Sequence, residues 1–208
     1  MKIYLVRHGK KEQEITLNDD GYPDMELTEL GKLQAEKTGL WLSNIKFDAV
    51  YASDLKRTVQ TAMGITEHQH NDLDIMVDTR IKEINMGVFH YMSPIEVEKK
   101  HPEFYSVFKK RDTDFTYLEG ESGADVTHRV INFLNDVVKQ SYENVCVATH
   151  GGVIRSIVSH FIGLDQKDRF KIVPYNCGIT VIEYQRDSVQ FRVCSVNEGL
   201  HLRDMLTT

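Results

Sequence analysis

Short runs of continuous apolar residues, separated by segments with helical periodicity, restrict the fold of this sequence more than any other feature. The runs cover residues 3–6, 49–52 and 145–148 and include β-branched side chains. Unbroken apolar runs of this length are typical of strands that are buried on both faces. Strands that alternate with helices predict an α/β fold, a three-layer sandwich with a mostly parallel central sheet and helices on both faces.

Three segments between and after these runs repeat apolar residues at the spacing of one helix face. The first residues of the three stripes are Leu55, Val126 and Ile154. Ser122 followed by Asp125 is typical of a capping box at the start of the second helix. Thr28 is a suitable N-cap for a further helix that reaches about Trp41.

The C-terminal part of the chain predicts an antiparallel edge of the sheet. Residues 179–182 and 189–193 have the composition of strands, and the four residues 185–188 between them are short enough for a hairpin. These strands also offer an edge that a second copy of the chain could pair with, so a homodimer is one option. The tail over residues 197–208 carries several apolar residues and is expected to pack on the body of the protein.

A single domain is predicted over residues 1–208, because a chain of this length can bury one sizeable core. Residues 84–120 break the alternation of strands and helices, since they mix aromatic and charged residues without a clear strand. We expect this segment to be a partly helical lid insertion over the carboxyl ends of the strands. Long insertions of this kind often select substrates.

Composition excludes several classes of partner. The net charge of −6 argues against a broad surface for nucleic acid or for an anionic membrane. The apolar runs are too short for a membrane span, and the first is too short for the core of a signal peptide. Three cysteines without metal-ligand spacing indicate reduced thiols, so we expect a cytoplasmic protein.

Two of the predicted buried strands run directly into a histidine. Residues 3–6 lead into Arg7 and His8, and residues 145–148 lead through a threonine into His150 and Gly151. The carboxyl ends of strands in an open α/β sheet meet at one edge, where ligands bind, so the two histidines are expected to lie close together. Gly151 opens a helix, and the free N–H groups and dipole of a helix N-terminus favour an anion.

Arg57 follows the second predicted strand and falls in the first turn of a helix, from which it can point toward the same edge. The planar guanidinium group of arginine suits the oxygens of a phosphate. Taken alone, Arg57 would be a solvated helix residue and His150 a core histidine. Their combination with Arg7 and His8 at the ends of two buried strands indicates a site for a phosphate-like anion.

At this point the sequence resembles the histidine phosphatase superfamily, which includes the phosphoglycerate mutases, over nearly the whole chain. The matching segments in chain order are residues 5–9, 27–35, 51–62, Glu83 with Gly87, 120–122 with Arg129, and 149–152. The resemblance implies a metal-independent, acid-type hydrolase that needs no cofactor. It also implies that a small phosphorylated metabolite is hydrolysed through a phosphohistidine intermediate.

The resemblance implies roles for individual residues. His8 is the nucleophile, and Arg7, Arg57 and His150, together with Gly151, bind the phosphoryl oxygens. Glu83 protonates the leaving alcohol and then helps to activate water. For His8 to attack with an unprotonated nitrogen, its other ring nitrogen should donate to a fixed acceptor, such as a backbone carbonyl near Gly9.

These roles require His8 to be unprotonated at one ring nitrogen and Glu83 to be protonated. Two guanidinium groups disfavour the imidazolium form of His8. Glu83 has to hold a proton, so burial or a bound phosphate should raise its pKa. The alternative for Glu83 is an ordinary surface carboxylate.

Departures from the mutase pattern favour a phosphatase. Lys10, Lys11 and Glu14 stand where the mutases have other polar residues, residues 89–91 depart from their pattern, and the long mutase insertion is missing. The alternatives are a phosphotransferase like the phosphoglycerate mutases, or a non-catalytic protein that binds a phosphorylated ligand.

Further residues are candidates for the substrate side of the pocket. Lys10 and Lys11 either recruit a second anionic group of the substrate or are solvated. The lid residues His90, Tyr91 and Tyr117 either line the pocket or pack inside the protein. No metal site is expected, because a pair of histidines at 68 and 70 is too small a set for zinc.

Overall fold

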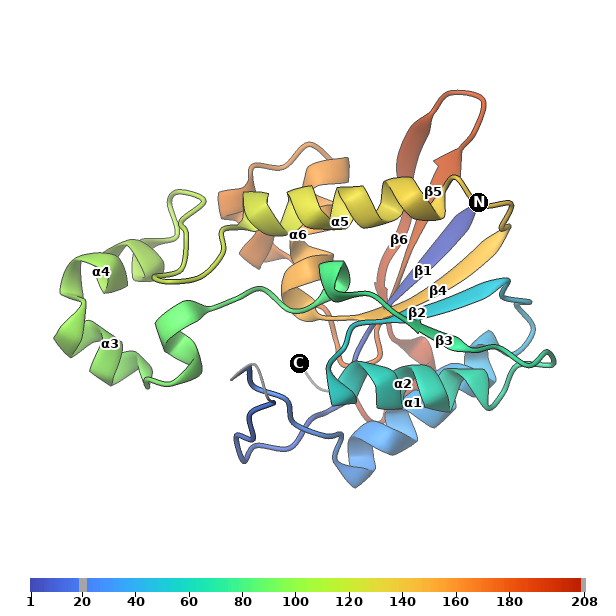
Figure 1. Cartoon of the computed structure of the whole chain (residues 1–208), viewed down its shortest axis with the longest axis horizontal. Helices are drawn as coiled ribbons and strands as arrows, with labels where there is room; N and C mark the ends of the chain where they lie inside the picture. The colour runs from blue at the N-terminus through green and yellow to red at the C-terminus, as the bar shows by residue number, and fades with distance from the viewer. Residues whose placement is uncertain (19–21, 207–208) are drawn as a thin grey trace.

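The computed structural model describes residues 1–18 and 22–206. It contains a six-stranded sheet with the strand order β3-β2-β4-β1-β5-β6 (Figure 1). The strands are β1 (Lys2–Arg7), β2 (Ala49–Ala52), β3 (Ile75–Val77), β4 (Asn144–Thr149), β5 (Ile179–Gln185) and β6 (Gln190–Glu198). The first four pair in parallel, and β5 and β6 are antiparallel, so the predicted α/β class and its antiparallel edge are confirmed.

Helices cover both faces of the sheet (Figure 1). The α-helices are α1 (Glu29–Leu42), α2 (Lys56–Thr66), α3 (Pro94–Lys100), α4 (Pro102–Lys110), α5 (Gly123–Val137) and α6 (Gly151–Phe161). Short 3₁₀ helices are η1 (Thr79–Ile81), η2 (Gly87–His90), η3 (Gln166–Lys171) and η4 (Leu200–Leu202). The helices α1 and α2 pack on one face of the sheet, and α5 and α6 pack on the other.

The continuous apolar run of β1 follows from this layering. Successive side chains of a strand point to opposite faces of the sheet. Ile3 and Leu5 lie in the core with α5 and α6, whereas Tyr4 and Val6 lie in the core with α1 and α2. Both faces of the strand are buried, so no polar residue interrupts it until Arg7.

The predicted helix starts agree with the structure. The Ser122 hydroxyl accepts the N–H of Asp125 at 3.1 Å, and the Asp125 carboxylate accepts the N–H of Ser122, which completes the capping box. The Thr28 hydroxyl accepts the N–H of Gly31 at 3.0 Å at the start of α1.

Two details differ from the sequence prediction. The apolar stripe predicted for α2 was Leu55, Val59, Ala62 and Met63, of which Leu55 and Ala62 are buried but Met63 is 48% exposed. The helix buries Thr58, Thr61 and Ile65 as well. Strand β3 was not predicted, since it has only three residues and none of them is fully buried.

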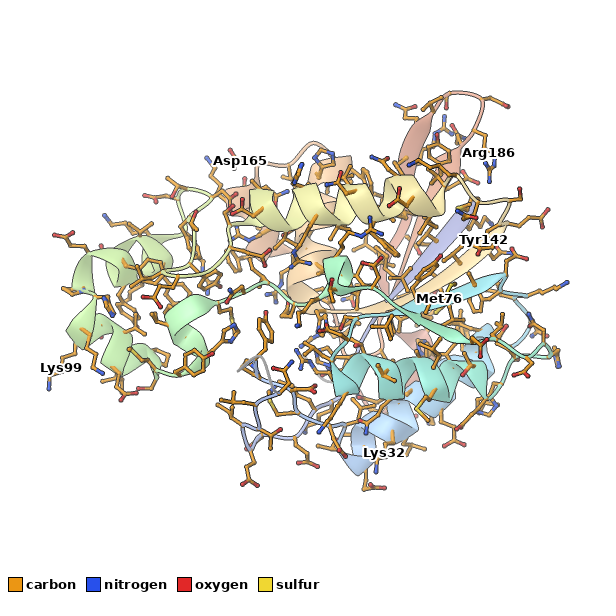
Figure 2. The ribbon with its side chains drawn as sticks, in the orientation of Figure 1. Lys32, Met76, Lys99, Tyr142, Asp165 and Arg186 are labelled. Atoms are coloured by element: carbon orange, nitrogen blue, oxygen red, sulfur yellow. The ribbon has the colours of Figure 1, made fainter. Side chains whose placement is uncertain are left out.

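The segment over residues 84–120 is partly helical and lies beyond the carboxyl ends of the parallel strands (Figure 1). Its outer surface is charged, and Lys99 on α3 points away from the rest of the molecule (Figure 2). Its inner side is aromatic: Phe115 stacks on Phe170 with ring centroids 6.0 Å apart. Asp114 also forms an ion pair at 2.6 Å with the buried Arg169.

The C-terminal tail packs on α1, as its apolar residues predicted. Leu202 is buried, and His201 Nε2 lies 2.9 Å from the hydroxyl of Thr38. Residues 207–208 of the predicted tail lie outside the described residues. Within the described part of the chain, no helix is long and apolar enough to cross a membrane.

Candidate active site

A cavity of about 450 Å³ opens where β1 ends, beside the first turn of α2 and the inner side of the lid segment. Its cationic side is formed by Arg7, Lys10, Lys11 and Arg57, next to His8 and Glu83. Its apolar side is formed by Ile15, Met25, Met86 and Phe89. The fold therefore brings the predicted site residues Arg7, His8, Arg57 and Glu83 to one cavity, although 76 positions separate Arg7 from Glu83 in the sequence.

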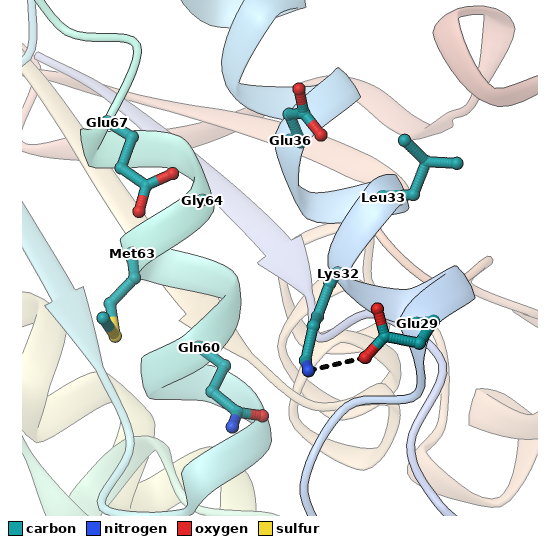
Figure 3. Close-up of a pocket in the computed structure, with 8 residues that line it drawn as sticks. All are labelled: Glu29, Lys32, Leu33, Glu36, Gln60, Met63, Gly64 and Glu67. Atoms are coloured by element: carbon teal, nitrogen blue, oxygen red, sulfur yellow. Dashed lines mark hydrogen bonds and ion pairs between the residues drawn. The ribbon is translucent and has the colours of Figure 1, made fainter.

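A second hollow, of about 650 Å³, lies between α1 and α2 and has a different character (Figure 3). It is lined by Glu29, Glu36 and Glu67, and its single lysine, Lys32, is paired with Glu29 at 2.7 Å. Carboxylates repel a phosphate, and no residue of the predicted site reaches this hollow. The smaller cationic cavity is therefore the candidate active site.

His8 is buried, and its ring is fixed in one orientation. Nδ1 lies 2.7 Å from the carbonyl oxygen of Gly9, as expected from the sequence. A carbonyl can only accept, so Nδ1 carries the proton and Nε2 keeps its lone pair. Burial, and then the charges of Arg57 and Arg7, hold the pKa of His8 well below its usual value of 6.5. The ring is therefore neutral, with the lone pair of Nε2 unprotonated.

Backbone carbonyls hold the two guanidinium groups in place. Nη1 of Arg7 donates to the carbonyl of Pro174 at 2.6 Å, and Nη1 of Arg57 donates to that of Pro23 at 3.1 Å. Among the described residues, neither Nε–H has a partner, although both are buried. A buried donor without a partner is costly, so an additional acceptor at either Nε–H would stabilise the site.

His150 lies behind His8 and does not line the cavity itself. The two ring centroids are 5.2 Å apart, and Nε2 of His150 lies 2.8 Å from the hydroxyl of Ser53. Nδ1 is buried and has no partner in the described part of the chain. Ser53 was not singled out from the sequence, although it belongs to the matching segment 51–62 and fixes the orientation of this ring.

The N-terminus of α6 binds a carboxylate. Oε1 of Glu83 accepts the N–H of Gly152 and that of Ile84, each at 2.9 Å. The N–H of Gly152 is thus taken by a carboxyl oxygen of Glu83, so this donor of the helix N-terminus is not left for a phosphate. Gly151 does not line the cavity, but a Cβ atom added to it would lie only 3.4 Å from Nε of Arg7.

The candidates for the substrate side divide into two groups. Lys10, Lys11 and His90 line the cavity. Tyr91, 64% exposed, lies outside it and lines an adjacent shallow groove instead, because the chain turns outward where η2 ends. Tyr117 is buried in the aromatic core of the lid, where it contacts Phe115 at a centroid distance of 5.1 Å.

Two further residues of the cavity carry no signal in the sequence. The Tyr22 hydroxyl donates to the backbone carbonyl of Glu83 at 2.8 Å, and the Asn176 side chain donates to that of His8 at 2.9 Å. Both lie in loops outside the matching segments, and only the tertiary structure brings them to the site. These two hydrogen bonds hold the backbone of Glu83 and of His8 in place.

Comparison with known proteins agrees with this geometry. Residues 3–197 match the model of the histidine phosphatase superfamily (branch 1). The chain belongs to this superfamily. It is 29% identical to the broad-specificity phosphatase YOR283W of Saccharomyces cerevisiae, over 98% of this chain and 88% of that protein. It is 32% identical to phosphoserine phosphatase 1 of Hydrogenobacter thermophilus, over 89% of this chain and 87% of that one.

The fold agrees with a solved structure of Bacillus stearothermophilus YhfR. The TM-score is 0.83 at 23% sequence identity, covering 97% of this chain and 99% of that one. The present chain is therefore a phosphatase of the histidine phosphatase superfamily, a superfamily that acts through a phosphohistidine on small phosphorylated metabolites.

Proposed function

We propose that the chain is a metal-independent, acid-type phosphatase in which His8 carries the phosphoryl group. The observation that supports this most is the fixed His8 ring, whose Nδ1 is held by Gly9 beside two buried guanidinium N–H donors, of Arg7 and Arg57, that have no partner in the described residues. A buried ring nitrogen of His150 also has no partner there. Phosphoryl transfer depends mainly on this kind of positioning and electrostatic stabilisation.

The proposed reaction has two steps. Nε2 of His8 attacks phosphorus, the bond to the ester oxygen breaks, and Glu83 donates a proton to the departing alkoxide. A water molecule then attacks the phosphohistidine, Glu83 takes its proton, and inorganic phosphate leaves with His8 restored. The two guanidinium groups and His150 stabilise the charge on the phosphoryl oxygens in both steps, so the mechanism needs no metal ion.

The acid-type assignment follows from the protonation of His8. Its pKa lies well below 6.5, because of burial and then the charges of Arg57 and Arg7. The nucleophile therefore stays unprotonated, and the acidic limb of its activity lies below pH 6.5.

A hydrolase is favoured over the mutase alternative. Lys10 and Lys11 line the cavity directly after the nucleophile, at the positions where the sequence departs from the mutases. The names of the two curated relatives, a broad-specificity phosphatase and a phosphoserine phosphatase, are consistent with hydrolysis of a small phosphate ester. We propose a substrate of that kind for this chain.

The test compares the wild type with His8→Ala on p-nitrophenyl phosphate in the presence of EDTA. We expect wild-type turnover to survive EDTA and to fall at least about 10³-fold in the variant, because the nucleophile is removed. His128→Ala, at an exposed histidine of α5, is the matched control and should keep full activity. Acid-labile, base-stable labelling of wild type by radioactive phosphate ester should disappear in His8→Ala only.

Other outcomes separate the alternatives. Turnover that EDTA abolishes would contradict the metal-independent mechanism. A stable phosphoenzyme that returns its phosphate to a phosphoglycerate would support the mutase. Binding of phosphate without any turnover would support a binding protein.

A further inference from the structure

Lys11 lines the active-site cavity but has no role in the two steps of the proposed hydrolysis. Its backbone pairs with Leu27 in an antiparallel bridge, and the next residue, Glu12, donates its N–H to the carbonyl of Glu26 at 2.9 Å. The backbone of Lys11 is therefore held in place, although the residue lies in the loop that follows His8. Its side chain is partly buried and lines the active-site cavity.

The ammonium group of Lys11 has no carboxylate partner. It reaches the backbone carbonyl of Glu12 at 3.5 Å, which is a weak contact. Within residues 1–18 and 22–206, no carboxylate lies at ion-pair distance from it. The side chain lines the same cavity as Arg7 and Arg57, and burial, and then the charges of these two arginines with Arg57 first, lower the pKa of Lys11. The ammonium group is therefore available to an anionic group of a ligand in the cavity.

Lys10 differs from Lys11 in how it is held. Its backbone N–H donates to Gln34 at 2.9 Å, and its carbonyl accepts the N–H of Thr28 at 2.9 Å. The Lys10 side chain also lines the cavity. The charges of Arg57 and Arg7 act on the ammonium group of Lys11, so Lys11 is the candidate and Lys10 is the comparison in the test.

The charges around the cavity indicate how much negative charge a substrate brings. Arg7, Arg57, Lys10 and Lys11 are cations, and Glu12 is the remaining carboxylate once Glu83 holds the proton that it donates. Three positive charges then remain, and a phosphate monoester dianion neutralises two of them. The third matches one carboxylate, whereas a second phosphate would bring more negative charge than the cavity compensates.

We propose that Lys11 is a specificity-determining residue that binds a carboxylate of the substrate, beside the phosphoryl group held by Arg7 and Arg57. The preferred substrate class is then a small phosphomonoester of a carboxylic acid. This inference rests on the proposed phosphatase activity of the same site. The cavity of about 450 Å³ has room for such a molecule, and its apolar side accommodates the carbon skeleton.

Two substrates that differ only in a carboxylate test the proposal: O-phosphoserine and O-phosphoethanolamine. We expect wild type to have a kcat/KM at least about tenfold higher for O-phosphoserine, since charge-assisted hydrogen bonds are strong. In Lys11→Met the ratio of the two kcat/KM values should fall about tenfold. Lys11→Arg, which keeps the charge, should retain most of the ratio. Lys46→Met, at an exposed lysine before β2, is the control and should leave the ratio unchanged.

Binding separates this proposal from the phosphatase assignment. In a His8→Ala background, calorimetric titration with the same two compounds should show tighter binding of O-phosphoserine, and Lys11→Met should remove that difference. This result would support the carboxylate site even if the chain proved unable to hydrolyse any ester. The proposal would be overturned if Lys11→Met left the ratio of the two kcat/KM values unchanged because both compounds lost activity equally or not at all. It would also be overturned if the ratio fell in Lys10→Met and not in Lys11→Met.

Discussion

At the scale of single residues, neighbouring groups fix the orientation of the two side chains that the proposed reaction uses. Gly9 holds the proton of His8 on Nδ1, and the nearby guanidinium groups disfavour a second proton. Glu83 is anchored through one oxygen, Oε1, to two backbone N–H groups. This leaves its other oxygen, Oε2, for the proton that the leaving alcohol requires.

Glu83→Gln tests this division of roles. Glutamine keeps an oxygen for the N–H groups of Gly152 and Ile84, but it has no acidic proton. We expect kcat/KM on an alkyl phosphate to fall by about 10²-fold or more, because an alkoxide is a poor leaving group without a general acid. On p-nitrophenyl phosphate, whose phenolate leaves unaided, the loss should be much smaller.

The control for this measurement is Glu103→Gln, at an exposed position of α4. It should match wild type on both substrates. Equal losses on the alkyl and aryl substrates would mean that Glu83 orients the site and does not donate a proton.

At the scale of elements, the loop after the nucleophile rests directly on α1. A Cβ atom on Gly9 would overlap the carbonyl of Gly31, and one on Gly31 would overlap that of Lys10, so both glycines are needed for this close approach. The buried Gln34 connects three parts of the chain: it accepts the N–H of Lys10 at 2.9 Å and donates to the carbonyl of Met205 at 2.7 Å. The C-terminal tail therefore supports the active-site loop through α1.

Gln34→Ala should lower the free energy of unfolding by about 1–3 kcal/mol, because it leaves the N–H of Lys10 and the carbonyl of Met205 without these partners. Urea denaturation followed by circular dichroism measures this change. Gln140→Ala, at an exposed glutamine, should have no effect of this size. A Gln34→Ala variant as stable as wild type would show that the tail and the loop are held independently.

At the scale of the whole molecule, burial of histidines links stability to pH. Burial holds the pKa values of His8 and His150 well below 6.5, and it lowers the pKa of His90 and takes that of His201 to about 4. The unfolded chain therefore binds more protons than the folded one once the pH falls below about 6.5. Stability from these groups is fully present above that pH and is lost as the pH decreases.

We expect the melting temperature to decrease between pH 7.5 and pH 5, with each fully neutral histidine contributing roughly 1.4 kcal/mol per pH unit below its unfolded pKa. Thermal unfolding at several pH values measures this slope. His8→Ala should remove the contribution of one histidine from this slope, whereas His128→Ala, at the exposed control position, should leave the slope unchanged. Added inorganic phosphate should raise the melting temperature by binding only the folded site. A slope that His8→Ala leaves unchanged would contradict the buried neutral state of His8.

The sequence by itself determined the α/β class, the antiparallel edge and the polar residues at the ends of β1 and β4. These features are local: a strand buried on both faces has to be apolar throughout, and its first polar residues mark the place where it ends. Arg57 was also predictable, because its position in the first turn of α2 follows from the end of β2.

Only the tertiary structure decided which hydrogen-bond partners surround these residues. Ser53 beneath His150, Asn176 behind His8 and Tyr22 on the backbone of Glu83 come from loops, and a contact between distant loops leaves no periodicity in the sequence. The occupation of the α6 N-terminus by Glu83 was likewise undetermined, because a helix dipole favours any anion and the packing of the chain selects which one is there.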